Sequence, residues 1–363
     1  MRVPLNEPSR GVQLMHSEIR HAFDRVLSSG WLVMGPENEA LADELSLFLD
    51  TPHTVLVGNG TDALEIALAT VGVRSGATVL TVANAGGYST TAIRQVGGTP
   101  LYVDIEPLTL QMSVDSLKAV LAGIPEKPSA IVVTHLYGHA APIEAICSLS
   151  ALHGIPVVED CAQSLGGMVS GKRLGTFGQI STTSFYPTKN LGALGDGGAI
   201  FTANSAYAVT ARALRQYGWS KRYHTDLPGG RNSRLDEIQA AVLRMRLPLL
   251  DRLNTRRRKI HTDYRGVNSR FGYLPHTGGK DFVAHLCIML SDQRDRVRSI
   301  FEAEGIATDI HYPIPDHLQR AYRGTSTQSL PVTEEMADRV LTLPLFPEMV
   351  EEELDRVMGV LGG

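Results

Sequence analysis

Hydrophobic and polar positions change their spacing along the chain, and the spacing predicts the elements. Apolar residues recur every three or four positions over 17–29 and 37–49, which indicates two amphipathic helices near the N-terminus. Beyond them, short apolar runs alternate with helical patterns. The expected strands are 54–57, 77–82, 101–104, 130–134, 155–160 and 198–202; a loop and helix are expected over 84–96, and further helices over 63–71, 114–122, 143–152 and 206–217. This alternation predicts βαβ units and a mainly parallel sheet covered on both faces.

The pattern changes after about residue 235 to a long helix rich in charged residues. An Arg-Arg-Arg-Lys cluster at 256–259 lies in its middle. We interpret the cluster as a solvated helix face, with a phosphate site as the alternative. From about Asp281 a smaller α+β unit is expected, with an apolar run at 283–290, a helix near 292–304 and two closing helices.

Length and composition bound the fold and the function. A chain of 363 residues is longer than one core usually supports, so we predict a large domain over 1–245 and a smaller one over 246–363. A formal charge of −4 provides no basic excess, which argues against nucleic-acid binding. The N-terminus lacks the apolar segment of a signal peptide and no uncharged run could span a bilayer, so we expect a cytoplasmic protein without membrane contact.

The three cysteines are odd in number and far apart in the sequence. They show no metal-ligand spacing, so we expect reduced thiols and no metal site. These residues are Cys147, Cys161 and Cys287.

A turn-rich loop around Lys189 is the first candidate for chemistry. The loop, residues 181–198, carries four glycines in the nine positions after the lysine. Glycine at that density suits a backbone with positive φ or a close approach of a ligand. A partly desolvated lysine amine can form a Schiff base with an aldehyde cofactor such as pyridoxal phosphate. A surface lysine on a flexible connection is the alternative.

A second candidate is the turn Gly-Asn-Gly-Thr-Asp at 58–62, between a predicted strand and a predicted helix. Free backbone N–H groups and the helix dipole make such a turn a phosphate site, although many strand-to-helix turns bind nothing. Because Ala63 stands where the dinucleotide fingerprint requires glycine, a nicotinamide cofactor is disfavoured.

A third candidate is the end of the strand that carries Glu159 and Asp160. Ligands of open α/β sheets bind beyond the carboxyl ends of the strands, where a carboxylate can keep a pyridine nitrogen protonated. A helix N-cap is the alternative for Asp160. Phosphate turn, strand-end acid and loop lysine together indicate pyridoxal phosphate.

Six stretches together resemble the sugar aminotransferases of the DegT/DnrJ/EryC1/StrS family, within the aspartate-aminotransferase fold. The resemblance covers nearly the whole chain and implies a type I pyridoxal-phosphate-dependent transferase: a large, mainly parallel seven-stranded α/β/α domain with a smaller C-terminal α+β domain. The stretches are GNGTDAL (58–64), HLYG (135–138), VEDCAQ (158–163), SFYPTKNLGALGDGG (184–198), NSRLDEIQAA (232–241) and HYPIPDHLQ (311–319).

The resemblance also implies a role for individual residues. Lys189 forms the internal aldimine, Asp160 pairs with the pyridine nitrogen, and Gln163 bonds the ring hydroxyl. The phosphate is held by Gly60, Thr61 and Ser184, and by Asn232 of a partner subunit. The last assignment implies a homodimer with shared sites.

One stretch departs from the commoner family pattern. Where many members carry a phenylalanine that stacks on the cofactor ring, this chain has Gly86, and we expect Tyr88 to stack instead. This variant and the RQYGW stretch at 215–219 resemble the subgroup that aminates C3 of a dTDP-linked 3-keto-6-deoxyhexose, with glutamate as amino donor in a ping-pong reaction. The residues expected to contact the sugar nucleotide are Tyr186, His135, His311 and Tyr312. For both histidines a structural role is equally open.

Four alternatives to this reading remain. One is amination at C4 of a nucleotide-linked 4-keto sugar, and another is a sugar dehydratase of the same fold, which would carry histidine in place of Lys189. The others are a non-catalytic regulator, expected to lose Lys189 or Asp160, and a nucleotide-binding dehydrogenase, disfavoured at Ala63. Trp219 and Tyr223 could belong to a lid, a nucleotide contact or a dimer-surface loop.

Overall fold

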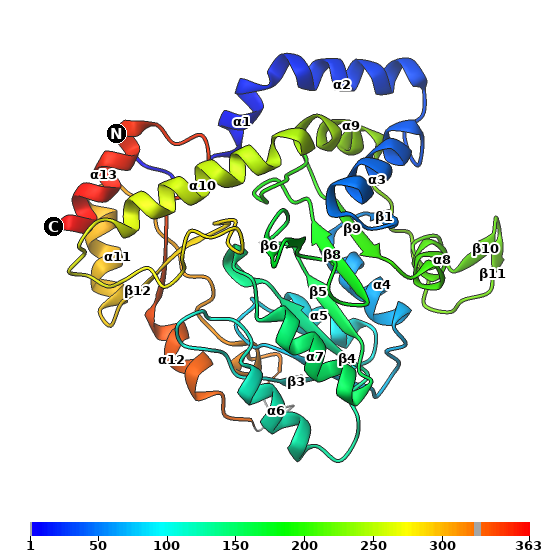
Figure 1. The fold of residues 1–363 in the computed structure, drawn as a ribbon. Helices are drawn as coiled ribbons and strands as arrows, with labels where there is room; N and C mark the ends of the chain where they lie inside the picture. The colour runs from blue at the N-terminus through cyan, green and yellow to red at the C-terminus, as the bar shows by residue number, and fades with distance from the viewer. Residues whose placement is uncertain (1, 323–327) are drawn as a thin grey trace.

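A seven-stranded sheet forms the centre of the molecule in the computed structural model, which describes residues 2–322 and 328–363 (Figure 1). The strand order is β1-β9-β8-β5-β4-β2-β3, and β9 alone runs antiparallel to its neighbours. The strands are β1 (His53–Val57), β2 (Thr78–Thr81), β3 (Thr99–Tyr102), β4 (Ala130–Thr134), β5 (Val157–Asp160), β8 (Ile180–Ser184) and β9 (Gly198–Thr202). The expected mainly parallel sheet is therefore present.

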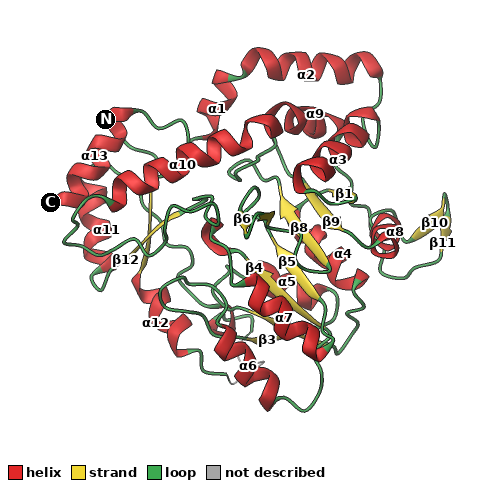
Figure 2. Ribbon diagram, in the orientation of Figure 1, coloured by secondary structure: helices red, strands yellow, loops and turns green. Residues whose placement is uncertain are grey.

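Helices cover both faces of the sheet because successive strand residues point in opposite directions. In β5, Val157 packs under one layer and Val158 under the other. One layer consists of α4 (Gly60–Thr70), α5 (Tyr88–Gln95) and α8 (Ser205–Leu214); the other consists of α3 (Pro36–Leu49), α6 (Val114–Gly123), α7 (Ile143–His153) and α9 (Glu237–Arg246). Figure 2 shows the strands enclosed by these helices.

The chain after α9 builds a second apolar core. Its elements are α10 (Leu250–Arg265), β12 (Cys287–Leu290), α11 (Arg294–Ala303), β13 (Val340–Leu343) and α13 (Glu351–Gly362), whereas α12 (Pro331–Arg339) packs through Met336 against the core of the large sheet. Val3 joins this core and pairs with Ile306, so the first residues lie with the C-terminal part rather than with the large sheet. The predicted boundary after residue 245 falls at the last turn of α9 and stays a prediction.

Several short elements were not predicted. They are the strands β8 and β13, the helix α1 (Pro8–Leu14), the two-strand pairs β6 (Met168–Val169) with β7 (Lys172–Arg173) and β10 (Trp219–Lys221) with β11 (His224–Thr225), and the 3-10 turns η1 (Leu136–Gly138), η2 (Leu247–Leu249) and η3 (Asp316–Leu318). The first predicted helix is α2 (His16–Ser29). The hairpin β10–β11 projects from the body beside α8 (Figure 1).

The cluster at 256–259 is not simply a solvated face, so that interpretation is wrong at its centre. Arg257 is buried, and its guanidinium donates a hydrogen bond to the carbonyl oxygen of Leu345 (3.2 Å). Arg256 donates to the carbonyl oxygen of Met349 (3.3 Å). These arginines satisfy backbone carbonyls of the segment before α13, which a helix pattern cannot reveal because the acceptors lie about 90 residues away.

The cysteines agree with the expectation, since all three are free thiols. Among the described helices, none combines the length and apolar character needed to cross a membrane.

Candidate active site

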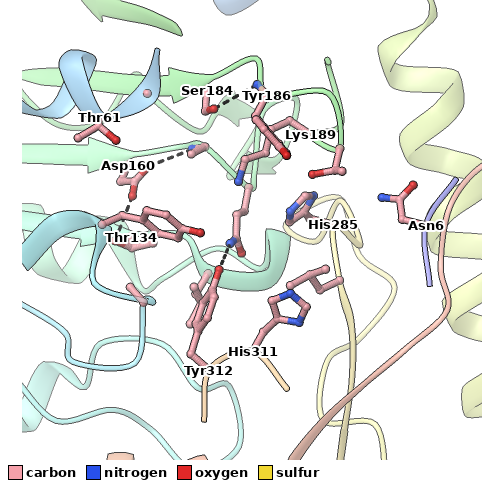
Figure 3. A pocket seen from close by; sticks show the side chains of 18 of the residues that line it. Asn6, Thr61, Thr134, Asp160, Ser184, Tyr186, Lys189, His285, His311 and Tyr312 are labelled. Atoms are coloured by element: carbon pink, nitrogen blue, oxygen red, sulfur yellow. Dashed lines mark hydrogen bonds between the residues drawn. The ribbon is translucent and has the colours of Figure 1, made fainter. Parts of the chain in front are cut away.

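A cavity of about 740 Å³ opens where the carboxyl ends of the parallel strands meet the C-terminal part of the chain. The segments that follow β1, β2, β4, β5 and β8 each contribute to its wall. Figure 3 shows the side chains of Asp160, Lys189 and Tyr312 converging on it. Ligands of open α/β sheets bind at this edge, so the cavity is the candidate site.

One wall of the cavity is the N-terminus of α4. The side chain of Asn59 caps the helix by accepting a hydrogen bond from the backbone N–H of Asp62 (2.8 Å). The backbone N–H groups of Gly60 and Thr61 precede that bond and face the cavity with the positive end of the helix dipole. This arrangement can hold a phosphate.

Ser184 lies directly against this turn. A Cβ atom on Gly60 would come within 2.7 Å of the Ser184 Cβ, so only glycine allows the helix end and the end of β8 to approach this closely. The Ser184 hydroxyl, which accepts a hydrogen bond from the N–H of Tyr186 (3.2 Å), keeps its own proton for a ligand. The three residues predicted to hold phosphate therefore share one corner of the cavity.

Asp160 is a buried carboxylate at the end of β5. Its Oδ1 accepts from the N–H of Ala162 (3.0 Å), and its Oδ2 receives only a long contact from the Thr134 hydroxyl (3.4 Å). Burial raises the pKa of Asp160, while the Ala162 bond and the Lys189 charge oppose the rise. Such a group retains free acceptor capacity for a cationic N–H of a ligand.

Gln163 has a fixed orientation in the floor of the cavity. Its Oε1 accepts from the N–H of Tyr137 (2.6 Å), so its amide nitrogen must face outward. That nitrogen donates to the hydroxyl of Tyr312 (3.2 Å) and has a second proton for a ligand.

Lys189 lies inside the cavity and has no hydrogen-bond partner for its amine among the described residues. Burial lowers the pKa of the amine, and the carboxylate of Asp160 opposes that shift in part. A lysine amine with a lowered pKa is more often unprotonated and therefore more nucleophilic.

The aromatic side of the cavity is formed by Tyr88 and Tyr312, whose ring centroids lie 6.1 Å apart in an edge-to-face arrangement. Gly86 has φ +73°, and a Cβ there would lie 2.8 Å from two carbons of the Tyr312 ring. Tyr312 thus occupies the space that a side chain at position 86 would need. The stacking role of Tyr88 stays a prediction, since its half-exposed ring lines the cavity without a fixed partner for its face.

The predicted substrate residues divide into two groups. Tyr186, His311 and Tyr312 line the cavity, and His311 Nδ1 is 2.8 Å from the hydroxyl of Thr342. The structure does not bring His135 to the cavity. That imidazole is fully buried, with Nε2 at 3.1 Å from Glu159 Oε2 and Nδ1 accepting from the N–H of Ala141 (3.0 Å).

The same buried network accounts for the potential metal ligands His135, Glu159 and Cys161, whose donor atoms lie within 4.8 Å of one another. The Glu159 carboxylate accepts the backbone N–H groups of Gly175, Phe177 and Gly178 at 2.7–2.9 Å, in addition to His135. These bonds use the oxygens that a cation would need, so the cluster braces β5 against the following loop.

Asn232 is exposed and does not line the cavity. Its neighbour Ser233 accepts from the N–H of Gly58 (2.9 Å) and donates to Asp62 Oδ2 (2.7 Å), so the segment around Asn232 braces the phosphate turn from behind. Trp219 and Tyr223 also lie away from the cavity, on the projecting hairpin, where their ring centroids are 5.3 Å apart.

Asn6 and His285 are among the residues of the cavity that were missed in the sequence. Asn6 arrives from the N-terminal segment and His285 from the apolar run before β12, and both are visible in Figure 3. A histidine inside an otherwise apolar stretch was the available signal for His285. Nothing in the N-terminal sequence singled out Asn6.

The groups at this site fit pyridoxal phosphate on structural grounds. A helix N-terminus next to Ser184 offers donors for the phosphate, and Asp160 offers a buried carboxylate with spare acceptor capacity. Lys189 offers an amine to which no described residue is hydrogen-bonded. All three face one cavity (Figure 3).

Comparison with known proteins also indicates a pyridoxal-phosphate-dependent aminotransferase, over nearly the whole chain. The model of the DegT/DnrJ/EryC1/StrS aminotransferase family matches residues 13–362. A dTDP-3-amino-3,4,6-trideoxy-α-D-glucose transaminase of Streptomyces venezuelae is 39% identical over 362 residues, covering 98% of this chain and 94% of that protein. A UDP-N-acetyl-3-dehydro-α-D-glucosamine 3-aminotransferase of Acidithiobacillus ferrooxidans is 36% identical over 351 residues, covering 96% and 94%.

Among solved structures, S. venezuelae DesV in complex with a ketimine intermediate superposes with a TM-score of 0.95 at 36% identity, covering 99% of this chain and 98% of that one. The predicted fold class of a pyridoxal-phosphate-dependent transferase is thereby confirmed. From its matched length, its relatives and the shared architecture, the chain belongs to the DegT/DnrJ/EryC1/StrS aminotransferase family.

Proposed function

We propose that this aminotransferase moves an amino group from glutamate to the C3 keto group of a dTDP-linked keto-6-deoxyhexose, by a ping-pong reaction in a homodimer. The observation that carries the proposal is the convergence of Lys189, Asp160 and the N-terminus of α4 on one cavity. Pyridoxal phosphate supplies the aldehyde that carries the amino group between substrates and the ring that withdraws electrons from the substrate carbon.

Residues of the chain bind the cofactor and transfer the protons. Asp160 would keep a positive charge on the ring nitrogen, which strengthens electron withdrawal, and Gln163 would donate its free N–H to the ring hydroxyl. The α4 N-terminus and Ser184 would hold the phosphate. Lys189, with its lowered pKa, takes a proton from the donor carbon as general base and later delivers one to the sugar carbon.

The substrate assignment rests on the cavity and on the relatives. Tyr186, His311 and Tyr312 line the cavity and offer hydroxyl and imidazole groups for hydrogen bonds to a sugar. The relatives act on dTDP and on UDP sugars by name, and both are named for an amino group at C3. We choose dTDP and C3 because the sequence variants at 84–88 and 215–219 resemble that subgroup. Amination at C4 is the competing outcome.

The test has two stages. Addition of glutamate to the purified protein should convert the absorption of bound pyridoxal phosphate into that of the pyridoxamine form. The converted protein is then offered dTDP- and UDP-linked 3-keto and 4-keto sugars, and the aminated product is placed by mass spectrometry and NMR. A C4-amino product would overturn the C3 assignment, and absence of any shift with glutamate would overturn the donor. Absence of bound cofactor would overturn the whole proposal.

A further inference from the structure

A directed line of hydrogen bonds runs from helix α10 to the cavity and ends on His285. Asn254 of α10 donates through Nδ2 to the carbonyl oxygen of Leu165 (3.1 Å). Its Oδ1 accepts from Nδ2 of Asn190 (2.7 Å), and Oδ1 of Asn190 lies 2.8 Å from Nδ1 of His285. The three polar side chains are all buried, and Asn190 follows Lys189 directly in the chain.

The anchors of this line fix the direction of every bond. A backbone carbonyl can only accept, so Asn254 must turn its amide nitrogen to Leu165 and its oxygen to Asn190. A second carbonyl, that of Val283, accepts from Nδ2 of Asn190 at 3.1 Å and fixes the same orientation. The Asn190 oxygen therefore accepts from His285, and the imidazole must carry its proton on Nδ1.

The other ring nitrogen of His285 is left as an acceptor on the cavity wall. Nε2 has no hydrogen-bond partner in the described part of the chain, and His285 lines the cavity next to Lys189 (Figure 3). Burial lowers the pKa of His285, and the charges of Lys189, Arg257 and His311 act in the same direction. The ring is thus neutral at physiological pH, and its lone pair stays available.

The Lys189 amine is the complement of this acceptor. A lysine amine has donors on a stem with four rotatable bonds, and that of Lys189 has no partner among the described residues. An amine that is alternately bound and released during a reaction must return to one position each time. A fixed hydrogen-bond acceptor beside the amine restricts the rotation of the lysine side chain and so helps the amine return to that position.

We infer that His285 is a positioning residue for Lys189: its Nε2 accepts a hydrogen bond from the freed amine, and the line Leu165–Asn254–Asn190 keeps that nitrogen unprotonated. The inference rests on the proposed function, in which Lys189 acts as general base. It assigns a task to two buried asparagines and a histidine that the reaction scheme does not otherwise use.

The tautomer of His285 is tested first, by nitrogen-15 NMR of histidine-labelled protein carrying its cofactor, with His285→Gln to identify the signal. We expect the Nδ1–H tautomer from about pH 6 to 8.5. An Nε2–H tautomer, or a protonated ring at pH 7, would overturn the inference. This measurement needs no turnover, so it stands even if the proposed substrates fail.

The second test compares His285→Leu with His285→Gln, because glutamine can present an oxygen near the position of Nε2. The single-turnover rate with glutamate should fall about 3- to 10-fold in the leucine variant, the usual effect of losing a hydrogen bond between neutral groups. The glutamine variant should recover most of that rate, with KM for glutamate within twofold in both. Equal rates in all three proteins, or equal losses in both variants, would overturn the inference.

Asn190→Asp provides a variant that keeps the shape of the site. A carboxylate on Nδ1 raises the pKa of His285 and favours the imidazolium, which has no acceptor nitrogen. We expect a new loss of rate on the acidic side of the pH profile, absent from the wild type. An unchanged profile, with the protein folded and loaded with cofactor, would overturn the inference.

Discussion

The contact between Gly86 and Tyr312 allows a prediction with an internal control. Gly86→Ala places a Cβ 2.8 Å from two carbons of the Tyr312 ring, at a backbone φ of +73°. Gly87→Ala has a similar φ of +81°, yet its Cβ would meet nothing within 4 Å. Both variants carry the cost of a left-handed backbone at a non-glycine residue, about 1 kcal/mol. Only the first also forces the ring to move.

The ring cannot move freely, because its hydroxyl accepts a hydrogen bond from Gln163 (3.2 Å). Loss of that bond costs about 1 kcal/mol, and overpacking a filled site typically costs about 1–3 kcal/mol. We therefore expect Gly86→Ala to lower the free energy of unfolding by about 3–5 kcal/mol and Gly87→Ala by about 1 kcal/mol. Turnover should fall only in the first variant, because Tyr312 lines the cavity.

Urea unfolding followed by circular dichroism measures both variants, and Tyr312→Ala provides the remaining corner of a double-mutant cycle. In the Tyr312→Ala background the extra cost of Gly86→Ala should disappear. Equal midpoints for the two alanine variants in the wild-type background would refute the reasoning, as would an extra cost that persists without the ring.

Four further predictions concern the site and the buried core. Lys189→Ala should lower turnover by about 1,000-fold or more while circular dichroism stays unchanged, and activity within tenfold of wild type would contradict its role. Asp160→Asn should weaken cofactor affinity by about 10- to 100-fold in equilibrium dialysis, because a charged hydrogen bond is lost; equal affinity would count against the pairing. Asn232→Ala chains, mixed with Lys189→Ala chains, should regain activity in hybrid dimers, since one site then has both residues; no recovery on mixing would argue against a contribution from the partner. His261 is buried, neither of its ring nitrogens has a hydrogen-bond partner among residues 2–322 and 328–363, and burial lowers its pKa to about 3. The unfolded chain takes up that proton near pH 6.5, so stability is full above that pH and is lost as pH falls towards 3, by about 2 kcal/mol at pH 5 from this group. His261→Leu should reduce the difference between unfolding midpoints at pH 7.5 and pH 5, and an unchanged difference would exclude His261 as its source.

Local sequence could predict the elements that have a clear period and the residues that lie next to a turn. Six of the seven strands of the large sheet agree with the expected runs within a few residues, whereas β8, with the sequence Ile-Ser-Thr-Thr-Ser, was missed because it has almost no apolar residues and was assigned to the loop around Lys189. Gly60, Asp160 and Lys189 reach the cavity because each lies at the end of a strand or in the segment that follows one. The pairs β6–β7 and β10–β11 were missed, since two or three residues show no alternation.

Contacts between residues distant in sequence determine the side-chain positions that the sequence could not predict. His135 pairs with the buried Glu159 and does not face the cavity, and Arg257 is buried where it donates to the carbonyl oxygen of Leu345. The spacing of apolar residues in a helix or strand does not reveal such partners. The orientation of His285 depends on Asn254 through Asn190, so the chemistry of that imidazole follows from the tertiary structure alone.

The position of the N-terminal segment has a consequence for the order in which the molecule assembles. Val3 exchanges backbone hydrogen bonds with the chain at Gly305 and Ala307, and the N–H of Leu345 reaches the carbonyl oxygen of Leu5. The N-terminal segment can therefore be fixed only after segments far later in the sequence have folded, and Asn6 enters the cavity wall with it. The large sheet uses none of these contacts, whereas the cavity beside it is completed only once the N-terminal segment has docked on the C-terminal part.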